Sequence, residues 1–347
     1  MSQKTNGKKE TALEWFIRNW KTNPIFSTAC VLVLMIVLQT LALGFRFDSF
    51  AKWFTSWYKN WINILRNNAG VGIVALGMTF VIISGGIDLA VGSTMVAVGA
   101  VMMILINDNP TGLLAAAGVT GGLAFALGIA AALIVGALIG AINGALISYR
   151  KLPAFIATLG MMKICRSVTQ QCMQTVGVKV PKAFLLISNA KIGGEVILPI
   201  LYWLVIAVLL HVVSRRTPFG RQIYAIGSNE RTARLSGVNV ERVKAGVYVL
   251  MGLLVAVTAV IQVSRIGSMD YANAGSGYEM DAIAAVVVGG TSMAGGRGSI
   301  LGTVLGMLII AVMNNLLNLL GVPPFLREAF KGFIVIAAVL LQRKESN

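Results

Sequence analysis

Charged residues are scarce in this chain. Only 12% of its 347 residues are Asp, Glu, Lys or Arg, against about 25% in a typical soluble domain, and its mean hydropathy is +0.80. The apolar residues form long runs, such as 25–43, 196–213 and 245–263. About 20 apolar residues allow a helix to cross the roughly 30 Å hydrocarbon core of a bilayer. The composition excludes an ordinary soluble domain and predicts an all-α, polytopic integral membrane protein.

Residues for catalysis or metal binding are also few. The chain has one histidine, His211, and three cysteines, none of them in a CxxC pair. It contains no GxSxG, no HExxH and no Walker A sequence, the motifs that would supply a nucleophile, a zinc site or a phosphate cradle. The sequence therefore predicts no catalytic residues, no metal and no cofactor, and a protein that is not an enzyme.

Acidic residues are the scarcer of the two charged classes, 13 against 29 Lys and Arg, which gives a net charge of +16. In a soluble chain this excess would suggest nucleic acid, but Lys and Arg also concentrate in the cytoplasmic loops of membrane proteins. No stacked aromatic residues or basic helix favour nucleic-acid binding. We interpret the charge as topology and expect no nucleic-acid partner.

The apolar runs predict about ten membrane-spanning helices, with nine or eleven also compatible. Lys and Arg are more numerous on one side of this arrangement, which puts both termini in the cytoplasm. The chain then divides into an interfacial segment (1–24), a transmembrane domain (25–341) with an inward loop (214–244), and a cytoplasmic tail (342–347). The predicted spans are residues 25–43, 62–84, 88–107, 123–148, 152–173, 196–213, 245–264, 280–290, 300–320 and 328–341.

Two glycine pairs interrupt apolar runs, Gly85-Gly86 and Gly289-Gly290. Both pairs are candidates for hinges or for close helix packing. Glycines also recur every fourth residue at 136–144 and 298–306, which places small residues on one helix face and favours close approach of two helices.

Three carboxylates adjoin predicted spans. Asp88 follows the first glycine pair, and Glu279 and Asp281 precede the run at 282–288. Carboxylates at membrane depth tend to line a cavity or pair with a cation, but Asp also caps helix N-termini. We favour capping for Asp88, and either capping or a favourable interaction with the positive helix N-terminus for Glu279 and Asp281; a role in the path or at the outer mouth is the alternative.

The long inward loop, 214–244, carries signals of a short helix. Ser228 is a candidate N-cap, Glu230 suits the first turn and Gly237 suits the stop. We expect a helix at about 229–236, displayed on the cytoplasmic face; the alternative is a solvated basic loop.

Five segments resemble motifs of the permease subunits of ribose-type ATP-binding-cassette (ABC) sugar importers. They occur in the order typical of that family and, together, the resemblance extends from about residue 71 to the C-terminus. The segments are GMTFVIISGGIDLAVGS (77–93), NGALISYRKLPAFIATLGM (143–161), AIGSNERTARLSGVNV (225–240), YEMDAIAAVVVGGTSMAGGRGS (278–299) and NNLLNLLGVPPF (314–325).

The resemblance implies a homodimer in the bacterial cytoplasmic (inner) membrane, with two ATPase subunits inside and an extracytoplasmic sugar-binding protein outside. It implies ATP-driven alternating access for a monosaccharide, with a pentose such as ribose favoured over a hexose. Residues 229–240 resemble the coupling helix that fits the ATPase, although Glu230 stands where relatives often have Pro. The coupling residues would be Ser228, Asn229, Glu230, Ala233, Arg234 and Gly237.

Other functions remain open at this stage. A single-chain, ion-coupled secondary sugar transporter would use an intramembrane carboxylate such as Asp88, and ABC nucleoside permeases are related to the sugar permeases. A purely structural membrane protein is a third alternative. The candidate residues of the path or outer mouth are Asp88, Asn143, Glu279, Asp281 and Asn314.

Overall fold

A computed structural model describes residues 11–44, 49–110, 112–174 and 176–345. Residues 1–10 of the predicted interfacial segment and residues 346–347 of the predicted tail lie outside the described part. The described residues form helices and no sheet. In chain order the helices are α1 (Ala12–Thr22), α2 (Pro24–Leu43), α3 (Phe50–Ile83), α4 (Val91–Ile106), α5 (Leu113–Ala116), α6 (Gly121–Ser148), α7 (Ala154–Met173), α8 (Lys182–Asn189), α9 (Leu198–Arg216), α10 (Pro218–Ser228), α11 (Glu230–Leu235), α12 (Val240–Ile266), α13 (Tyr278–Val288), α14 (Ile300–Leu319) and α15 (Pro324–Glu345).

Local sequence explains where several helices begin. Asn23 accepts hydrogen bonds from the backbone N–H groups of Ile25 and Phe26, with Pro24 as the first residue of α2. Ser299 caps α14 in the same way through the Gly302 N–H. Such side chains satisfy N–H groups that have no partner within the helix.

All ten predicted spans coincide with a helix. Six helices in the described part are long and apolar enough to cross a membrane, namely α2, α3, α6, α9, α12 and α14, so the chain is a multi-pass membrane protein. Helix α4 is apolar but has only 16 residues, and α13 has 11. Helices α7 and α15 are long enough, with 20 and 22 residues, but are not among the six, so the count of about ten spans stays a prediction.

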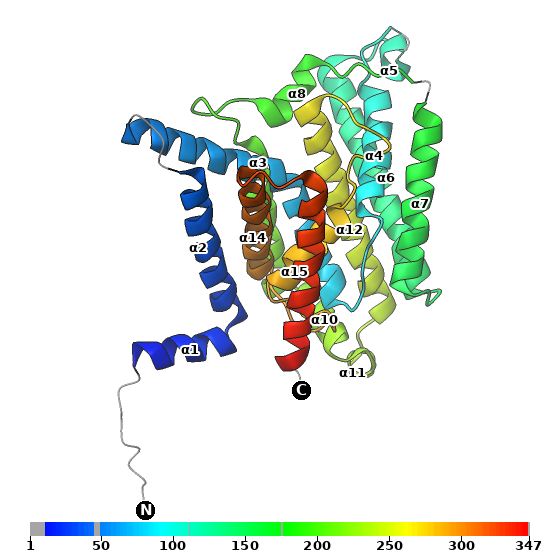
Figure 1. The fold of residues 1–347 in the computed structure, drawn as a ribbon. Helices are drawn as coiled ribbons and strands as arrows, with labels where there is room; N and C mark the ends of the chain where they lie inside the picture. Colours follow the sequence, from blue (N-terminus) through cyan, green and yellow to red (C-terminus); the bar gives the residue numbers. More distant parts are fainter. Residues whose placement is uncertain (1–10, 45–48, 111, 175, 346–347) are drawn as a thin grey trace, which may run out of the picture.

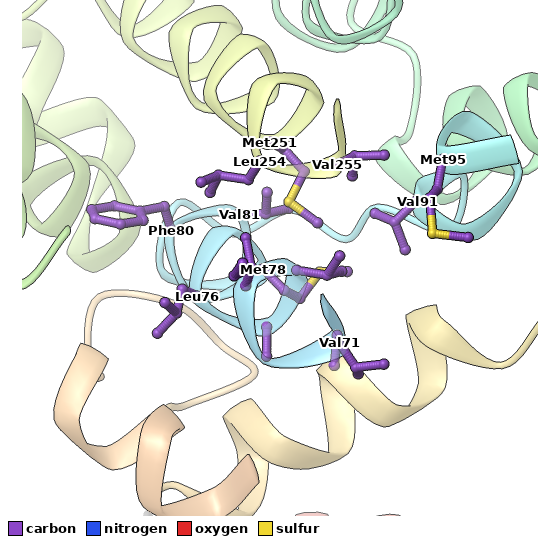
Figure 2. Packing of buried hydrophobic residues seen from close by; sticks show 14 of the residues in the cluster. Val71, Leu76, Met78, Phe80, Val81, Val91, Met95, Met251, Leu254 and Val255 are labelled. Carbon is purple, nitrogen blue, oxygen red and sulfur yellow. The ribbon is translucent and has the colours of Figure 1, made fainter. Parts of the chain in front are cut away.

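Helices α3 and α12 occupy the centre of the bundle. In the most apolar 18-residue stretch of each helix, 78% of the residues of α3 and 67% of those of α12 are buried, compared with 17% in α2 and 22% in α6. Figure 2 shows Met251 and Leu254 of α12 beside Met78 and Val81 of α3. Helices α9, α13 and α14 also pack on α3. The core is therefore built between helices and not beneath a sheet.

The first glycine ladder brings α6 against α12. A β-carbon on Gly140 would overlap the carbonyl of Tyr248, and one on Gly144 would lie 2.9 Å from the Ala245 Cα. The second ladder does the same between α14 and α13, where Gly306 meets the carbonyl of Ala285. The packing that the spacing predicts is confirmed at both places.

Helices α1 and α2 stand to one side of the bundle (Figure 1), where α2 packs on α14. Helix α1 lies across the lower end of α2, and Phe26 contacts both Trp15 and Phe16. The C-terminal end of α15 and the short helices α10 and α11 lie at this same lower end (Figure 1). The loops around α5 and α8 lie at the opposite end.

Candidate functional site

The first glycine pair separates α3 from α4. Gly85 has a φ of +81°, a conformation that L-residues rarely adopt, and residues 84–90 are not helical before α4 begins at Val91. Asp88 is buried, 5% exposed, and its Oδ1 accepts the backbone N–H of Ala90 at 2.9 Å. The N-cap of α4 is Ala90, without a side-chain bond. The prediction that Asp88 caps this helix is wrong. Asp88 lies in the turn before the helix, and its side chain accepts a hydrogen bond from the N-cap residue Ala90 rather than from a helical residue.

A second break separates α12 from α13. Residues 267–277 form turns, with positive φ at Gly267, Gly275 and Gly277. The N-cap of α13 is Gly277, which makes no side-chain capping bond. Neither Glu279 nor Asp281 is the cap, but both lie in the first turn of α13, at the positive end of the helix dipole, which is the other of the two structural roles predicted for them.

The N-termini of α4 and α13 meet. A β-carbon on Gly92 would overlap the Gly275 carbonyl and lie 3.2 Å from the Glu279 carboxylate. From this junction the two helices run in opposite directions. Helix α4 ends at Asn107, which accepts the Lys179 N–H at 2.9 Å in the α7–α8 connection. Helix α13 ends at Gly289-Gly290, beside Pro24 at the start of α2.

The junction therefore lies partway through the bundle. The 16 residues of α4 span about 24 Å and the 11 residues of α13 about 16 Å, at 1.5 Å a residue. These lengths are about four fifths and about half of the roughly 30 Å hydrocarbon core of a bilayer. Glu279 and Asp281 accordingly lie near the junction of the two helices, and a role at the outer mouth stays a prediction.

Charged groups gather at this junction. Glu279 is partly buried and interacts electrostatically with Asp88 and with Arg166 of α7. The Arg166 guanidinium donates hydrogen bonds to the carbonyls of Tyr271 (3.1 Å) and Ala274 (2.8 Å). A cation from α7 and two carboxylates thus surround the place where the two helices start.

Asp281 points toward another element. Its carboxylate lies 2.9 Å from Nζ of Lys331 on α15, and these side chains are only 15% and 12% exposed. Lys331 also donates to Glu328 at 2.8 Å. Asp281 therefore holds α15 against α13 through a buried ion pair.

The inward loop contains the expected short helix. Asn229, not Ser228, is the N-cap of α11, because its side chain accepts the Thr232 N–H at 2.9 Å while Ser228 is the last residue of α10. Gly237 follows α11 with a φ of +83°, as the stop signal predicts. Helix α10, capped by Thr217 with Pro218 at its first position, is not anticipated by the sequence analysis.

Helix α11 has one buried and one exposed side. Ala233 is 4% exposed and packs into the protein's own core, whereas Leu235 is 82% exposed. Arg231 and Arg234 are exposed beside Leu235. A partner could meet Leu235 and the two arginines but not Ala233, which corrects the part expected for Ala233.

Ion pairs tie α11 to its neighbours. Glu230 lies 2.7 Å from Lys244 of α12, and this hydrogen bond lowers the pKa of the Glu230 carboxyl below its ordinary value. Arg234 lies 2.6 Å from Glu241 of α12. Glu241 in turn lies 2.9 Å from Lys151 in the α6–α7 connection.

A cavity of about 210 Å³ lies beside this network. It is bounded by the end of α3, the end of α6 and the start of α12. Gly85 and Gly86 line it on one side and Glu230 and Lys244 on the other. Helix α11 thus has open space between itself and the first glycine break.

The two glycine breaks converge at this end of the bundle. The Gly296 N–H donates to the Ile83 carbonyl at 3.0 Å. A β-carbon on Gly86 would overlap the Tyr248 hydroxyl, and one on Gly289 would lie 2.5 Å from the carbonyl carbon of Gly302. The four glycines therefore end helices, and Gly86, Gly289 and Gly290 also permit close packing, whereas Gly85 supplies the positive φ; a hinge role stays a prediction.

The two candidate asparagines are not brought together. Asn143 is buried on α6, which packs on α12 and α4, and Asn314 lies on α14, which packs on α2 and α13. The amide oxygen of each has no hydrogen-bond partner among the described residues. The described residues also contain no cluster of three or more His, Cys, Asp or Glu side chains that could hold a metal.

The comparison with known proteins gives the family. The model of the family described as "Branched-chain amino acid transport system / permease component" matches residues 60–339. The chain belongs to this permease family. It is similar to the ribose import permease protein of Bacillus subtilis, 44% identical over 83% of this chain and 85% of that protein. The ribose import permease protein of Escherichia coli K12 is 38% identical over 92% of this chain and 93% of that protein. The xylose transport system permease protein of the same strain is 32% identical over 89% of this chain and 90% of that protein.

Membership explains the chemistry that the chain lacks. A permease component of a transport system supplies the passage through the membrane, and ATP hydrolysis belongs to a different subunit. Such a subunit needs helices that pack closely, as α3 and α12 do in the centre of the bundle and α4 and α13 do at their junction.

The sequence does not predict the interactions of two positively charged residues of this permease, Arg166 and Lys331. Arg166 and Lys331 each lie within a predicted span, 152–173 and 328–341, and a charge within a span is itself a signal of function or pairing. Sequence alone could mark both residues. Their partners, the carbonyls of 267–277 and the Asp281 carboxylate, depend on how α7 and α15 pack.

Proposed function

We propose that this permease is the transmembrane subunit of a bacterial ABC importer for a monosaccharide, with a pentose such as ribose as the favoured substrate. It works as a homodimer in the cytoplasmic membrane with ATPase subunits and an extracytoplasmic sugar-binding protein. Transport proceeds by alternating access. The substrate class rests on relatives named for ribose and xylose that align over more than four fifths of the chain.

The observation that carries a transport role is the meeting of two half-helices partway through the bundle. Broken helices with N-termini aimed at a common point are a recurring substrate site in transporters, because free N–H groups and polar side chains are available there. Asp88 and Glu279 adjoin this point. We assign the sugar's route past the α4–α13 junction, where carboxylates accept hydrogen bonds from hydroxyl groups.

Helix α11 supports coupling to an ATPase. It lies at the same end as α1 and the end of α15, exposes Leu235, Arg231 and Arg234, and is held to α12 by the ion pairs of Glu230 and Arg234. A displacement of α11 would be transmitted to α12 by the ion pairs of Glu230 and Arg234, and to the α6–α7 connection by the Glu241–Lys151 pair. The neighbouring cavity gives α11 room to shift, since well-packed interiors resist small displacements.

Apolar side chains cover the outside of α2, α6 and α9, including Leu34, Leu138 and Leu204, all more than half exposed. Such surfaces suit lipid. The second copy is proposed from the resemblance to homodimeric permeases.

Reconstitution tests the function. The permease, its ATPase and its binding protein in proteoliposomes should take up labelled ribose when ATP is present, and a protonophore should leave uptake unchanged. Uptake by the permease alone, driven by a pH step, would overturn the proposal. Uptake of a labelled nucleoside in place of sugar would overturn the substrate class.

The second candidate function is ion-coupled secondary transport. The buried Asp88 carboxylate in the first break favours it, because intramembrane carboxylates serve as ion sites. The reconstitution experiment separates the two, since only the secondary transporter would respond to the gradient.

A further inference from the structure

Arg166 lies in α7 and reaches across to the broken segment between α12 and α13. Its Nη1 atom donates to the carbonyls of Tyr271 and Ala274 at 3.1 and 2.8 Å. These two carbonyls belong to residues 267–277, which form turns and no regular helix. One charged side chain thus satisfies two backbone groups at once.

Irregular backbone is costly within a membrane bundle. Each carbonyl without a partner costs several kcal/mol in hydrocarbon, so such segments persist only where protein groups or a water-filled path satisfy them. Hydrogen bonds from a charged donor are also stronger than those from a neutral one. Arg166 therefore stabilises the turn that ends at Gly277.

This turn closes the junction. The Gly275 carbonyl abuts Gly92 so closely that a β-carbon there would overlap it, and Glu279 follows one turn later beside the same glycine. Arg166 also attracts the Glu279 carboxylate electrostatically. Movement of residues 271–274 away from α7 would open the contact between Gly275 and α4.

We propose that Arg166 is a positioning residue for transport, holding residues 271–274 so that Gly275 seals against α4 until the permease is driven to open. The inference rests on the proposed sugar importer and names the residue that keeps its junction shut. Loss of Arg166 leaves a sugar route that no longer depends on ATP.

The test compares Arg166→Gln with Arg166→Lys and with Lys163→Gln. Lys163 lies one turn earlier on the exposed side of α7, so its loss of charge is the matched control. Lys keeps the charge but replaces the planar guanidinium, whose Nη1 serves both carbonyls, by a compact ammonium on a flexible stem. Proteoliposomes loaded with labelled ribose report passive efflux without ATP. A Ser276→Cys substitution, at an exposed position in the turn, is added to each variant and reports the turn's mobility through the rate of thiol labelling, followed by peptide mass spectrometry.

Arg166→Gln should raise passive efflux at least about tenfold, the effect of losing roughly 1.4 kcal/mol of closure, and speed thiol labelling at position 276. Passive efflux and thiol labelling of Arg166→Lys should lie between those of Arg166→Gln and the wild type. Lys163→Gln should match the wild type in both measurements. The inference is overturned if wild-type import is ATP-driven while Arg166→Gln shows neither leak nor faster labelling. It is likewise overturned if Arg166→Gln merely unfolds and Arg166→Lys behaves as wild type. Failure of the wild type to import any sugar would instead refute the proposed function.

Discussion

At the residue scale, the Lys331–Asp281 pair is the most consequential contact of α15. Both side chains are largely buried, and removing one partner of a buried pair leaves an uncompensated charge, which costs about 3–5 kcal/mol. Lys331→Met should therefore lower the thermal unfolding temperature strongly. Lys331→Met combined with Asp281→Leu should recover most of the loss, because no charge is then stranded.

Thermal unfolding of the detergent-purified permease measures both variants. Lys179→Met serves as the control, since the Lys179–Asp108 pair is 3.7 Å long and exposed, and such pairs contribute little. A double variant no more stable than Lys331→Met would contradict the ion-pair explanation.

Leu235 gives a second test at this scale. Because its side chain is 82% exposed while Ala233 is 4% exposed, Leu235 is the apolar group available to an ATPase. Burial of such an anchor contributes about 2 kcal/mol, so Leu235→Asp should weaken ATPase binding by roughly 30-fold. Binding of purified ATPase to the immobilised permease measures the effect.

The matched control is Leu320→Asp. Leu320 is 63% exposed and follows α14 at the other end of the bundle, so the same change there should leave ATPase binding intact. Equal binding by wild type and Leu235→Asp would remove α11 as the docking element. Ala233→Trp is a poorer test, since the bulky side chain would disrupt the permease's own packing.

At the element scale, the α6–α12 pair depends on glycine. A β-carbon on Gly140 would overlap the Tyr248 carbonyl, and forcing extra atoms into such a contact costs about 1–3 kcal/mol or more. Gly140→Val should therefore lower the unfolding temperature and reduce transport together. Gly160→Val on α7, where nothing lies within 4 Å, should change neither. A Gly140→Val protein as stable as the wild type would show that the two helices separate without cost.

The elements also show which local signals are reliable. Gly237 is predicted as a stop and adopts φ +83°, because only glycine takes this conformation without strain. The N-cap of α11 is displaced by one residue, from Ser228 to Asn229, since both residue types can cap and the preceding helix α10 runs on to Ser228. Asp88 fails as a cap for a related reason: its side chain bonds the Ala90 N–H in a turn before the helix begins.

At the scale of the whole molecule, the permease has a buried central helix and two N-terminal helices at one side of the bundle. Helix α3 is buried between α9, α12, α13 and α14, whereas α2 packs on α14 at one side of the bundle and α1 packs on α2 (Figure 1). The ends predicted to face the cytoplasm gather at the lower end of that view, together with α11 and both glycine breaks. This arrangement places the proposed coupling helix beside the breaks that would have to move.

The sequence by itself determined the class of protein and the position of its helices. A long apolar run has no stable alternative to a helix in lipid, because backbone groups must be satisfied within the segment, and motif resemblance across 77–325 then names the family. Only the tertiary structure decided what the charges do. Asp281 meets Lys331 from 50 residues away, and Arg166 meets carbonyls more than 100 residues later. Such partners are chosen by how helices pack in space, and residue spacing along the chain carries no record of that choice.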